Sequence, residues 1–312
     1  MKKMSSSPFV TVLILSYNGK KLLDDSISSY LANDYVNFEV VVIDNGSTDG
    51  TQEYVKSKWK NVELLRLDQN KGYSGGFNFG LDYAFNKKDA DFVLITNNDV
   101  VADKKIISSL ADTAKDDEKI GFVTGKVLFF DNPKVIQTAG KKEDKIRLNG
   151  PDIGLNEIDD GQYDYISEIP FADDIFMLVS KNLFFEVGGY DETFFLQAEQ
   201  FDWQVRAKKQ NFKILYTYKA FLYHKESMTI GKVSAEKEYY NSRNSMIVIL
   251  KHKDPLFFKR YLWNHFFYRV VYKSLKSILK FQIKTSLYVV LGFFSGIKWG
   301  FVNKKFTIKH FI

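Results

Sequence analysis

The stretch ADFVLITNNDVV, residues 90–101, joins a short apolar run to an abrupt polar cluster. Residues 92–95 are apolar throughout, which is typical of a strand buried on both faces of a parallel sheet. Asp99 lies just past the carboxyl end of this strand, where open α/β sheets bind ligands. A carboxylate there, beside amide side chains, suits a hard divalent cation that carries a phosphorylated ligand. The alternative interpretation is that Asp99 caps a helix that begins after it.

Other apolar stretches along the chain also end in polar residues. Residues 9–15, 38–43 and 62–67 predict strands, and helical patterns separate them. This alternation predicts βαβ units and an α/β fold, with a Rossmann-like, mostly parallel central sheet and helices on both faces. Because the carboxyl ends of such strands meet at one edge, their polar residues should form a site. These residues are Ser16, Tyr17, Asn18, Asp44, the loop from Asp68, and Asp99.

The stretch NKGYSGGFNFG, residues 70–80, places four glycines where a helix begins. Glycine there lets the backbone approach a ligand, and a helix N-terminus favours an anion. The first strand is followed by SYNGK, so a dinucleotide-binding glycine fingerprint is absent, as is a Walker A lysine motif. Asp44 ends the second strand, where it suits a ribose hydroxyl or, alternatively, forms an Asx-turn.

Composition limits the class of protein. The 312 residues are 45% hydrophobic and 26% charged, which is ordinary for a globular protein of one large domain or two. The chain has no cysteine, which excludes disulfides and favours a reducing compartment. The N-terminus lacks the apolar segment of a signal peptide, and no apolar run reaches the roughly 18–20 residues that span a bilayer. We therefore expect a cytoplasmic protein.

Charge is divided unevenly along the chain. Residues 251–312 hold 13 Lys and Arg against one acid, a net charge of +12, so residues 1–250 carry −6 of the total of +6. This basic region is rich in aromatic residues at helical spacing, and its most apolar piece, residues 287–294, is too short to span a membrane. We expect amphipathic helices on an anionic membrane surface. The alternatives are a helical subdomain packed on the rest of the chain or a homo-oligomer contact. Nucleic acid is disfavoured, because the acidic body would repel it.

Several motifs together resemble family 2 glycosyltransferases, and within them the bacterial rhamnosyltransferase-like branch of surface polysaccharide synthesis, including O-antigen. The motifs are FVTVLILSYNG, VVVIDNGSTDGT, NKGYSGGFNFG, LITNNDV, FMLVSKNLFFEVGGYDETFFLQAEQFDWQVR, HKESMTIG and YYNSRN, in that order. The resemblance covers roughly residues 8–250. It implies a GT-A fold, a nucleotide-diphosphate sugar donor, a divalent Mg or Mn ion, and inversion at the anomeric carbon in one displacement.

The resemblance also assigns roles to residues of this sequence. Asp99 would be the metal-binding acid of a degenerate acidic motif, and His224 would help to bind the metal or the diphosphate, although a lone histidine is more often structural. Arg243 would contact the diphosphate. The residues expected around the donor are Tyr17, Asn18, Asp44, Asn70, Gly72, Gly75, Gly76, Asn78, Asn98 and Arg243.

The cluster EQFDW, residues 199–203, departs from the family pattern. The family's general base falls at Gln200, and glutamine cannot accept a proton at neutral pH. Asp174 is a second departure, since the family has a small residue there; the alternative is a solvated loop acid. The candidate bases are Glu199, Asp202 and Asp174. We favour Glu199, because Glu199 and Asp202 could share one side of a helical turn and raise one pKa. Asp202 would then orient its neighbours, and Gln200 would hold the acceptor hydroxyl.

The expected protein is a metal-dependent inverting glycosyltransferase that uses a nucleotide-diphosphate sugar, rhamnose among the candidates. Its acceptor would be a hydroxyl of a glycan or lipid-linked molecule at the inner face of the bacterial cytoplasmic membrane. The expected organisation is a GT-A domain at residues 1–250, with a donor half at about 8–130 and an acceptor half at about 131–250, and a basic helical tail at 251–312. A catalytically impaired sugar-nucleotide-binding subunit and a nucleotidyltransferase are the alternatives.

Overall fold

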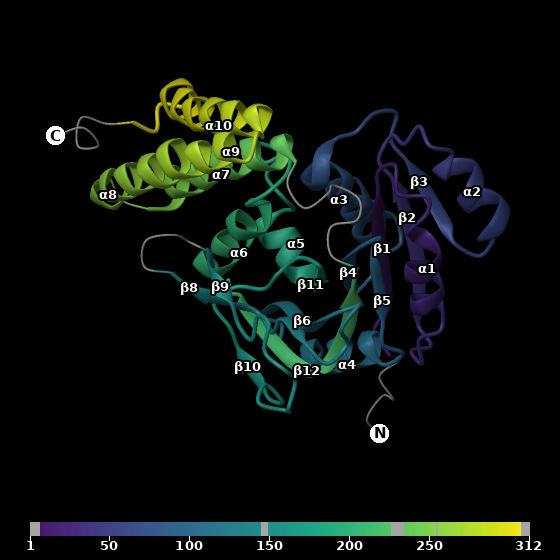
Figure 1. The fold of residues 1–312 in the computed structure, drawn as a ribbon. Helices are drawn as coiled ribbons and strands as arrows, with labels where there is room; N and C mark the ends of the chain where they lie inside the picture. Colours follow the sequence, from purple (N-terminus) through teal and green to yellow (C-terminus); the bar gives the residue numbers. More distant parts are fainter. Residues whose placement is uncertain (1–6, 145–148, 226–233, 254, 307–312) are drawn as a thin grey trace.

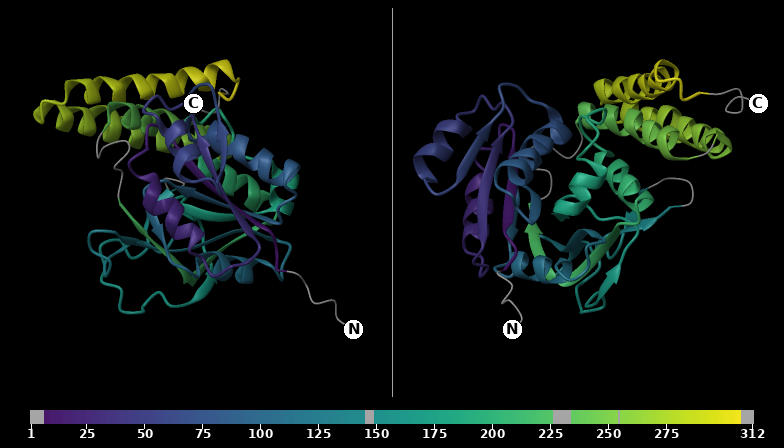
Figure 2. Two further views of the ribbon diagram at one scale, coloured as in Figure 1. Left: turned by 90° about the vertical axis from the view of Figure 1, so that its right-hand side faces the viewer. Right: turned by 180° about the vertical axis from the view of Figure 1, so that it is seen from behind.

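The computed structural model describes residues 7–144, 149–225, 234–253 and 255–306. Figure 1 shows a central sheet with helices against it and a separate layer of C-terminal helices across one end. The two further views in Figure 2 show the same C-terminal layer beside the rest of the molecule. The expected α/β fold with a C-terminal helical region is confirmed.

The main sheet has ten strands, in the order β10-β12-β6-β11-β4-β1-β2-β3, with β5 and β7 paired to β12 and β6. Strands β4, β1, β2 and β3 are parallel, whereas β11 runs antiparallel to both of its neighbours. The strands are β1 (Val10–Ser16), β2 (Phe38–Asp44), β3 (Glu63–Arg66), β4 (Phe92–Asn97), β5 (Val100–Ala102), β6 (Ile120–Phe129), β7 (Ile136–Thr138), β8 (Lys141–Glu143), β9 (Asn149–Asp152), β10 (Ile166–Glu168), β11 (Phe176–Ser180) and β12 (Lys213–His224).

Helices cover both faces of the sheet, because the buried strands have no polar face. On β1, Val12 and Ile14 contribute to one core, which includes residues of α1, α2 and α4. Leu13 points the other way, into a core shared with α3, α5 and α6. The helices are α1 (Leu23–Leu31), α2 (Thr51–Lys58), α3 (Gly72–Asp82), α4 (Ile106–Ala114), α5 (Lys181–Val187), α6 (Glu199–Lys209), α7 (Ala235–His252), α8 (Pro255–His265), α9 (Ser274–Leu279) and α10 (Ile283–Val302), with π-helical turns η1 (Tyr83–Lys87) and η2 (Phe266–Lys273).

The sheet order places the predicted strand ends together. Strands β2 and β4 lie on opposite sides of β1. The strand order therefore switches direction at β1, and α/β sheets bind ligands at such a switch point. The register pairs Ser16 with Asp44 and Leu15 with Asn97, so the ends of these three strands lie at one edge. Asp99 leads into strand β5 rather than into a helix, which rules out the helix-cap interpretation.

The C-terminal helices form a core of their own around α7. A stripe of glycines on α10 lets the two helices approach closely: a Cβ on Gly292 would lie 2.3 Å from the Tyr239 carbonyl oxygen, and Gly296 and Gly300 also meet α7 residues. The expected boundary between residues 250 and 251 falls inside α7 (Ala235–His252), so α7 belongs structurally with the helices that follow it.

One expectation about this region is wrong. The apolar segment is not limited to residues 287–294, because α10 (Ile283–Val302) is a continuous 20-residue helix with a mean hydropathy of 1.3 over its most apolar window. By length and composition it could cross a membrane, and it is the only such helix among the described residues. In this structure, 39% of that window is buried in the fold.

Candidate active site

A cavity of about 1030 Å³ lies at the carboxyl edge of the sheet. One wall comes from the ends of β1 and β4, a second from the loop before β11 and the start of α6, and a third from the C-terminal helices. Residues that represent these walls are Tyr17, Asn98, Asp99, Asp173, Asp174, Glu199, Gln200, Tyr240, Tyr261 and Tyr268. The strand ends and the acidic cluster predicted from the sequence therefore face one space.

Asp99 and His224 meet in this cavity as expected. Strand β12 pairs with β5 so that His224 opposes Val100, which brings the His224 Nε2 atom within 3.2 Å of Asp99 Oδ1. The His224 Nδ1 atom lies 2.9 Å from Gln137 Oε1, an acceptor, so Nδ1 carries a proton. The Nε2 atom and the Asp99 carboxylate therefore lie next to each other at the cavity, and an imidazole nitrogen beside a carboxylate oxygen is a ligand pair that suits a divalent cation.

The protein supplies few ligands at this position. No group of three or more His, Cys, Asp or Glu side chains in the described parts of the chain could hold a metal ion. The stretch ESMTIG that follows Lys225 falls outside the described residues. A cation held by Asp99 and His224 would need further oxygen ligands from a bound phosphate and water, which is how Mg²⁺ is usually held.

The three residues expected at the nucleoside differ in exposure. Tyr17 is exposed and lines the cavity. Asn18, in a left-handed conformation, braces the neighbouring loop by accepting a hydrogen bond from Thr48 N at 2.8 Å. Asp44 is fully buried, because Arg66 pairs with one carboxylate oxygen and Ser47 N donates to the other at 2.9 Å. The Asp44 carboxylate therefore braces the loop that follows β2, through a bond three residues on rather than the two of an Asx-turn, and it does not line the cavity.

The glycine stretch supports packing more than it lines the cavity. Asn70 and Gly72 line the cavity, and Gly72 has φ +72° with Phe195 O only 2.2 Å from where a Cβ would lie. Asn98 also faces it, and its amide donates to Ser16 Oγ at 3.2 Å. By contrast, Gly75 and Gly76 allow close approach to Lys71 and to Leu15.

Asn78 has a structural position rather than the expected one at the donor. Its side-chain amide donates to Tyr190 O at 2.9 Å and its carbonyl accepts from Tyr190 N at 2.8 Å. Arg243 likewise binds protein instead of open space: it donates to Thr193 O at 3.0 Å and to Asn244 Oδ1 at 2.6 Å. Both residues hold the loop that leads from α5 to α6.

Two buried acids that line the cavity, Asp174 and Glu199, have raised pKa values. Burial, and then the neighbouring Asp173 charge, raise the pKa of Asp174 to about 7. Burial, and then Asp174, raise the pKa of Glu199 well above that of an ordinary glutamate. Neither Asp174 Oδ2 nor Glu199 Oε2 has a hydrogen-bond partner among the described residues. Raised pKa values on acids in a cavity are typical of proton-transfer groups.

Asp173 differs from its neighbour because of Lys141. Burial alone would raise the pKa of Asp173, but the Lys141 ammonium, 2.8 Å away, lowers it. Asp173 is therefore the ionised acid, and its charge helps to keep Asp174 protonated. The sequence did not point to Lys141, which begins β8 and lies far from its partner Asp173 along the chain.

Gln200 also lines the cavity, and its Oε1 atom is buried without a hydrogen-bond partner among the described residues. An amide that faces the cavity in this way can bind a hydroxyl but cannot accept a proton.

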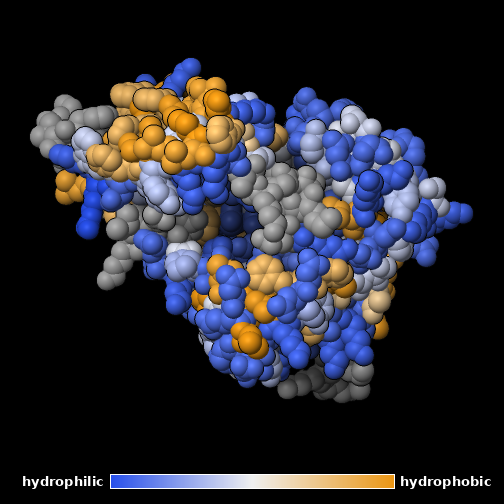
Figure 3. All heavy atoms as spheres, viewed as in Figure 1, coloured by the Kyte–Doolittle hydropathy of each residue, from blue (hydrophilic) through white to orange (hydrophobic). Residues whose placement is uncertain are grey.

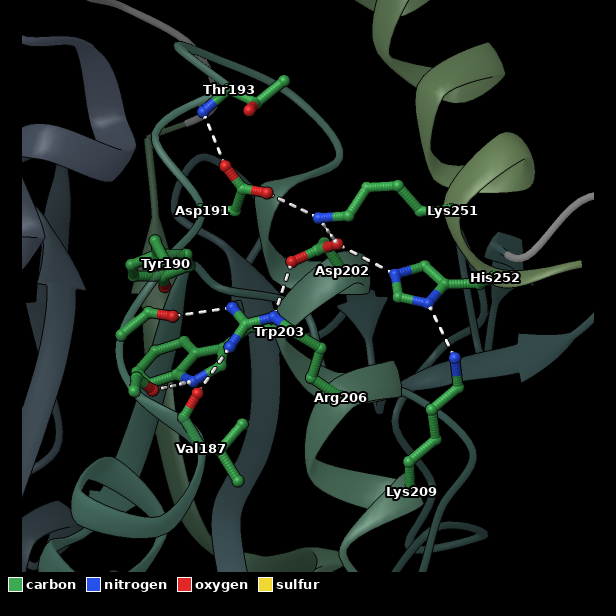
Figure 4. Close-up of polar contacts among 12 residues, drawn as sticks. Val187, Tyr190, Asp191, Thr193, Asp202, Trp203, Arg206, Lys209, Lys251 and His252 are labelled. Atoms are coloured by element: carbon green, nitrogen blue, oxygen red, sulfur yellow. Dashed lines mark hydrogen bonds and ion pairs between the residues drawn. The ribbon is translucent and has the colours of Figure 1, made fainter. Parts of the chain in front are cut away.

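Asp202 does not share a site with Glu199, contrary to the expected pairing on one side of the helical turn. Figure 4 shows its carboxylate among Arg206, Lys251 and His252, and Asp202 does not line the cavity. Arg206 Nε lies 2.8 Å from Asp202 Oδ2 and His252 Nε2 lies 2.8 Å from Oδ1. Burial opposes ionisation, but these partners and Lys251 hold the pKa of Asp202 well below its usual range. Asp202 therefore joins α6 to α7, and Asp174 takes the place of the second carboxylate beside Glu199.

Two more positioning residues could not be read from the sequence. Gln204 forms a double hydrogen bond with Ala172, accepting from its N at 2.8 Å and donating to its O at 3.1 Å, which fixes the backbone just before Asp173. Asn45 accepts from Lys71 N at 2.9 Å and donates to Gly72 O at 2.9 Å, which fixes the start of α3. In the sequence, the only indication of these roles was that Gln204 and Asn45 stand next to motif residues.

Comparison with known proteins is consistent with this arrangement. The family model described as "Glycosyl transferase family 2" matches residues 11–174. Poly-beta-1,6-N-acetyl-D-glucosamine synthase of Staphylococcus aureus is 28% identical over 128 residues, 40% of this chain and 29% of the synthase. The low-salt glycan biosynthesis hexosyltransferase of Haloferax volcanii is 24% identical over 176 residues, 56% of this chain and 55% of that enzyme. The chain thus spans less than two thirds of these relatives.

A solved structure shares the fold over most of the chain. The mannosyltransferase from Pyrobaculum calidifontis, in complex with GDP-Man and Mn²⁺, superposes with a TM-score of 0.57 at 13% identity. The match covers 94% of this chain and 88% of the mannosyltransferase.

Proposed function

Because the chain belongs to glycosyl transferase family 2, we propose that it is an inverting enzyme that moves a sugar from a nucleotide-diphosphate donor to an acceptor hydroxyl. The observation that carries this proposal is the shared cavity. It has the Asp99–His224 pair at the strand ends and the buried Asp174 and Glu199 carboxyls on another wall. The first pair suits the leaving diphosphate, and the second suits the attacking hydroxyl.

The proposed reaction is a single displacement. The acceptor oxygen forms a bond to the anomeric carbon as the bond from that carbon to the diphosphate oxygen breaks, and the nucleoside diphosphate leaves. Glu199 takes the acceptor proton, because its carboxyl is buried, has one oxygen without a hydrogen-bond partner among the described residues, and has a raised pKa, which makes its carboxylate a stronger base than an ordinary glutamate. Gln200 holds the hydroxyl, and Asp174 keeps the pKa of Glu199 high.

We propose Mg²⁺ or Mn²⁺ as the cofactor, held by Asp99 and His224. When bound, the ion would neutralise negative charge on the departing diphosphate. The Mn²⁺ named with the Pyrobaculum mannosyltransferase supports a divalent ion for this fold. Around it, Tyr17, Asn70, Gly72 and Asn98 are the donor-side residues that line the cavity.

The acceptor is proposed to be a glycan on a lipid carrier at the cytoplasmic face of the membrane. The helices that line the third wall of the cavity with Tyr261 and Tyr268 also carry exposed apolar residues on their outer side, such as Trp263 and Phe267. An acceptor with a polar head and an apolar tail suits both surfaces. In this division, residues from about 8 to 130 serve the donor, residues from about 131 to 250 serve the acceptor, and the C-terminal helices bind the membrane.

The sugar is best identified by binding. The motif resemblance favours rhamnose, whereas the relatives' names favour N-acetylglucosamine, another hexose or mannose. A thermal-shift panel of the corresponding nucleotide sugars with Mn²⁺ should single out one donor, since a ligand at 100 times its Kd stabilises a protein by about 2.7 kcal/mol. Transfer to a lipid-linked acceptor should then release nucleoside diphosphate. Release of pyrophosphate would identify a nucleotidyltransferase instead.

A second candidate is a sugar-nucleotide-binding subunit without catalysis, which Gln200 favours because an amide stands where the family has its base. Gln200→Asp separates the two. If the parent transfers sugar and the variant keeps or raises the rate, the chain is an enzyme with a displaced base. If only the variant transfers sugar, the natural chain is a binding subunit.

A further inference from the structure

The backbone just before Glu199 has an unusual conformation. Gln197 and Ala198 have φ values of 70° and 74°, so two successive non-glycine residues are left-handed. Ala198 is the N-cap of α6, and no side chain caps the helix there. Left-handed backbone costs a residue with a Cβ about 1 kcal/mol or more, so something outside the turn must hold it.

Asn244 of α7 holds this turn. Its side-chain amide donates to Leu196 O at 2.8 Å and to Gln197 O at 2.9 Å, so both amide hydrogens bind the turn. Arg243 donates to the Asn244 oxygen at 2.6 Å, which fixes the orientation of the amide. Asn244 is fully buried, and its three hydrogen bonds leave it no freedom to rotate.

The turn decides where Glu199 points. Glu199 is the first residue of α6, it is buried, and it lines the cavity with one carboxyl oxygen free of hydrogen bonds to the described residues. Tyr73 N also binds this loop, donating to Phe195 O at 2.7 Å, but it does so before the left-handed pair. Of these contacts, only those of Asn244 bind the two backbone carbonyls, Leu196 O and Gln197 O, that flank the first left-handed residue.

We propose that Asn244 is a positioning residue, which holds the left-handed turn at 197–198 and so aims the Glu199 carboxyl at the acceptor. This inference rests on the proposed function for the role of Glu199. It predicts that loss of Asn244 impairs the chemical step more than donor binding, because the donor-side residues lie on other elements.

The test uses Asn244→Ala in the full chain, with Asn33→Ala as a matched control. Asn33 also donates to two carbonyls, Ser29 O and Asp103 O, in a part of the molecule that does not line the cavity. Asn244→Ala should lower kcat about 10- to 100-fold, the usual effect of a small misplacement, with the donor KM within about 2-fold. Asn33→Ala should leave both constants within about 2-fold. An unchanged kcat in Asn244→Ala would overturn the inference.

A glycine at the turn supplies the second variant. Glycine adopts left-handed backbone without cost, so Ala198→Gly combined with Asn244→Ala should recover most of the lost kcat and also protect the fold. A double variant that folds but is no faster than Asn244→Ala would show that Asn244 does not act through the turn.

A direct readout of Glu199 separates this inference from the proposed function. Carboxyl ¹³C NMR can follow its titration among the groups that face it, Asp173, Asp174, Tyr73 and Tyr190. In Asn244→Ala the Glu199 midpoint should move down toward that of a solvated glutamate. If the parent transfers no sugar but this midpoint moves, the proposed function fails and the positioning role stands. If the parent transfers sugar and the midpoint does not move, the positioning role fails.

Discussion

Two residues, Asp174 and Glu199, set the pH range in which the cavity can accept a proton. Both are acids whose pKa is raised, first by burial and then by a neighbouring negative charge. Asp174 should lose its proton first, because its pKa is raised to about 7.

Glu199 is the proposed base, so the transfer rate should rise with pH as its carboxyl, whose pKa is raised, loses its proton. In Asp174→Asn the neighbouring negative charge is lost, so the pKa of Glu199 falls and the acid limb of the kcat profile moves to lower pH. Burial, which is the larger cause of the raised pKa of Glu199, is unchanged in this variant. Glu199→Gln should lose about 10²- to 10⁴-fold in kcat at every pH. If Asp174→Asn abolishes transfer and Glu199→Gln does not, Asp174 is the base.

Asp99 gives the second prediction at this scale. Asp99→Ala should weaken Mn²⁺-dependent binding of nucleotide about 10- to 100-fold, as measured by calorimetry with and without the metal. The melting temperature without ligand should change little, because the Asp99 side chain faces a cavity. Asp68→Ala is the control, since Asp68 follows a neighbouring strand but does not line the cavity. Equal Mn²⁺-dependent affinity in Asp99→Ala and the parent would contradict the metal role.

Which residues could be predicted from the sequence depended on where their partners lie. Asp99 was predictable, because it ends an apolar strand and sheet topology brings strand ends together. Asp202 was not predictable, because its partners Lys251 and His252 come from a helix about 50 residues later. The same holds for Asn78, whose partner is the backbone of Tyr190. Spacing along one helix cannot reveal such contacts.

At the scale of elements, the parallel strands were predictable and the later ones less so. Strands β1, β2 and β4 are continuous apolar runs, as expected of strands buried on both faces. Strand β12 is harder to predict, because an irregularity between Tyr216 and Phe221 interrupts its alternating pattern. Strand β11 was missed, because the residues FMLVS stand beside a helix pattern and resemble it in apolar character.

The packing of α10 on α7 yields the prediction at this scale. A leucine at Gly292 would put its Cβ against the backbone of Tyr239, which cannot yield without moving a helix. Gly292→Leu should lower the free energy of unfolding by about 2–3 kcal/mol in urea titrations. Lys298→Leu introduces the same side chain on the exposed face of α10 and should change it by less than about 0.5 kcal/mol. Similar values for the two variants would contradict the close packing of α7 and α10.

At the scale of the whole molecule, charge and apolar surface coincide on the C-terminal helices. Figure 3 shows hydrophobic side chains gathered over these helices, above an otherwise largely hydrophilic surface. Exposed residues there include Leu279, Phe281, Leu287, Leu291 and Phe294. The glycine face of α10 is turned to α7, and Leu287, Leu291 and Phe294 face outward. Two copies of this face would repel each other, because both carry positive charge. An anionic bilayer instead complements both the charge and the apolar residues of the face.

Full-length protein should therefore bind anionic liposomes at low salt and bind less as salt rises. Leu279→Ser with Phe281→Ser should weaken binding about 10-fold or more at all salt concentrations, because two apolar side chains leave the bilayer. Lys276→Glu with Lys280→Glu should weaken it mainly at low salt, since screening removes the charge term. Phe185→Ser, at an exposed phenylalanine on α5, is the control and should bind as the parent does. Sedimentation with liposomes of 0 to 40% anionic lipid measures all four. If the parent ignores anionic liposomes at low salt but sediments as a dimer that Phe281→Ser dissociates, the apolar face joins two copies of the chain.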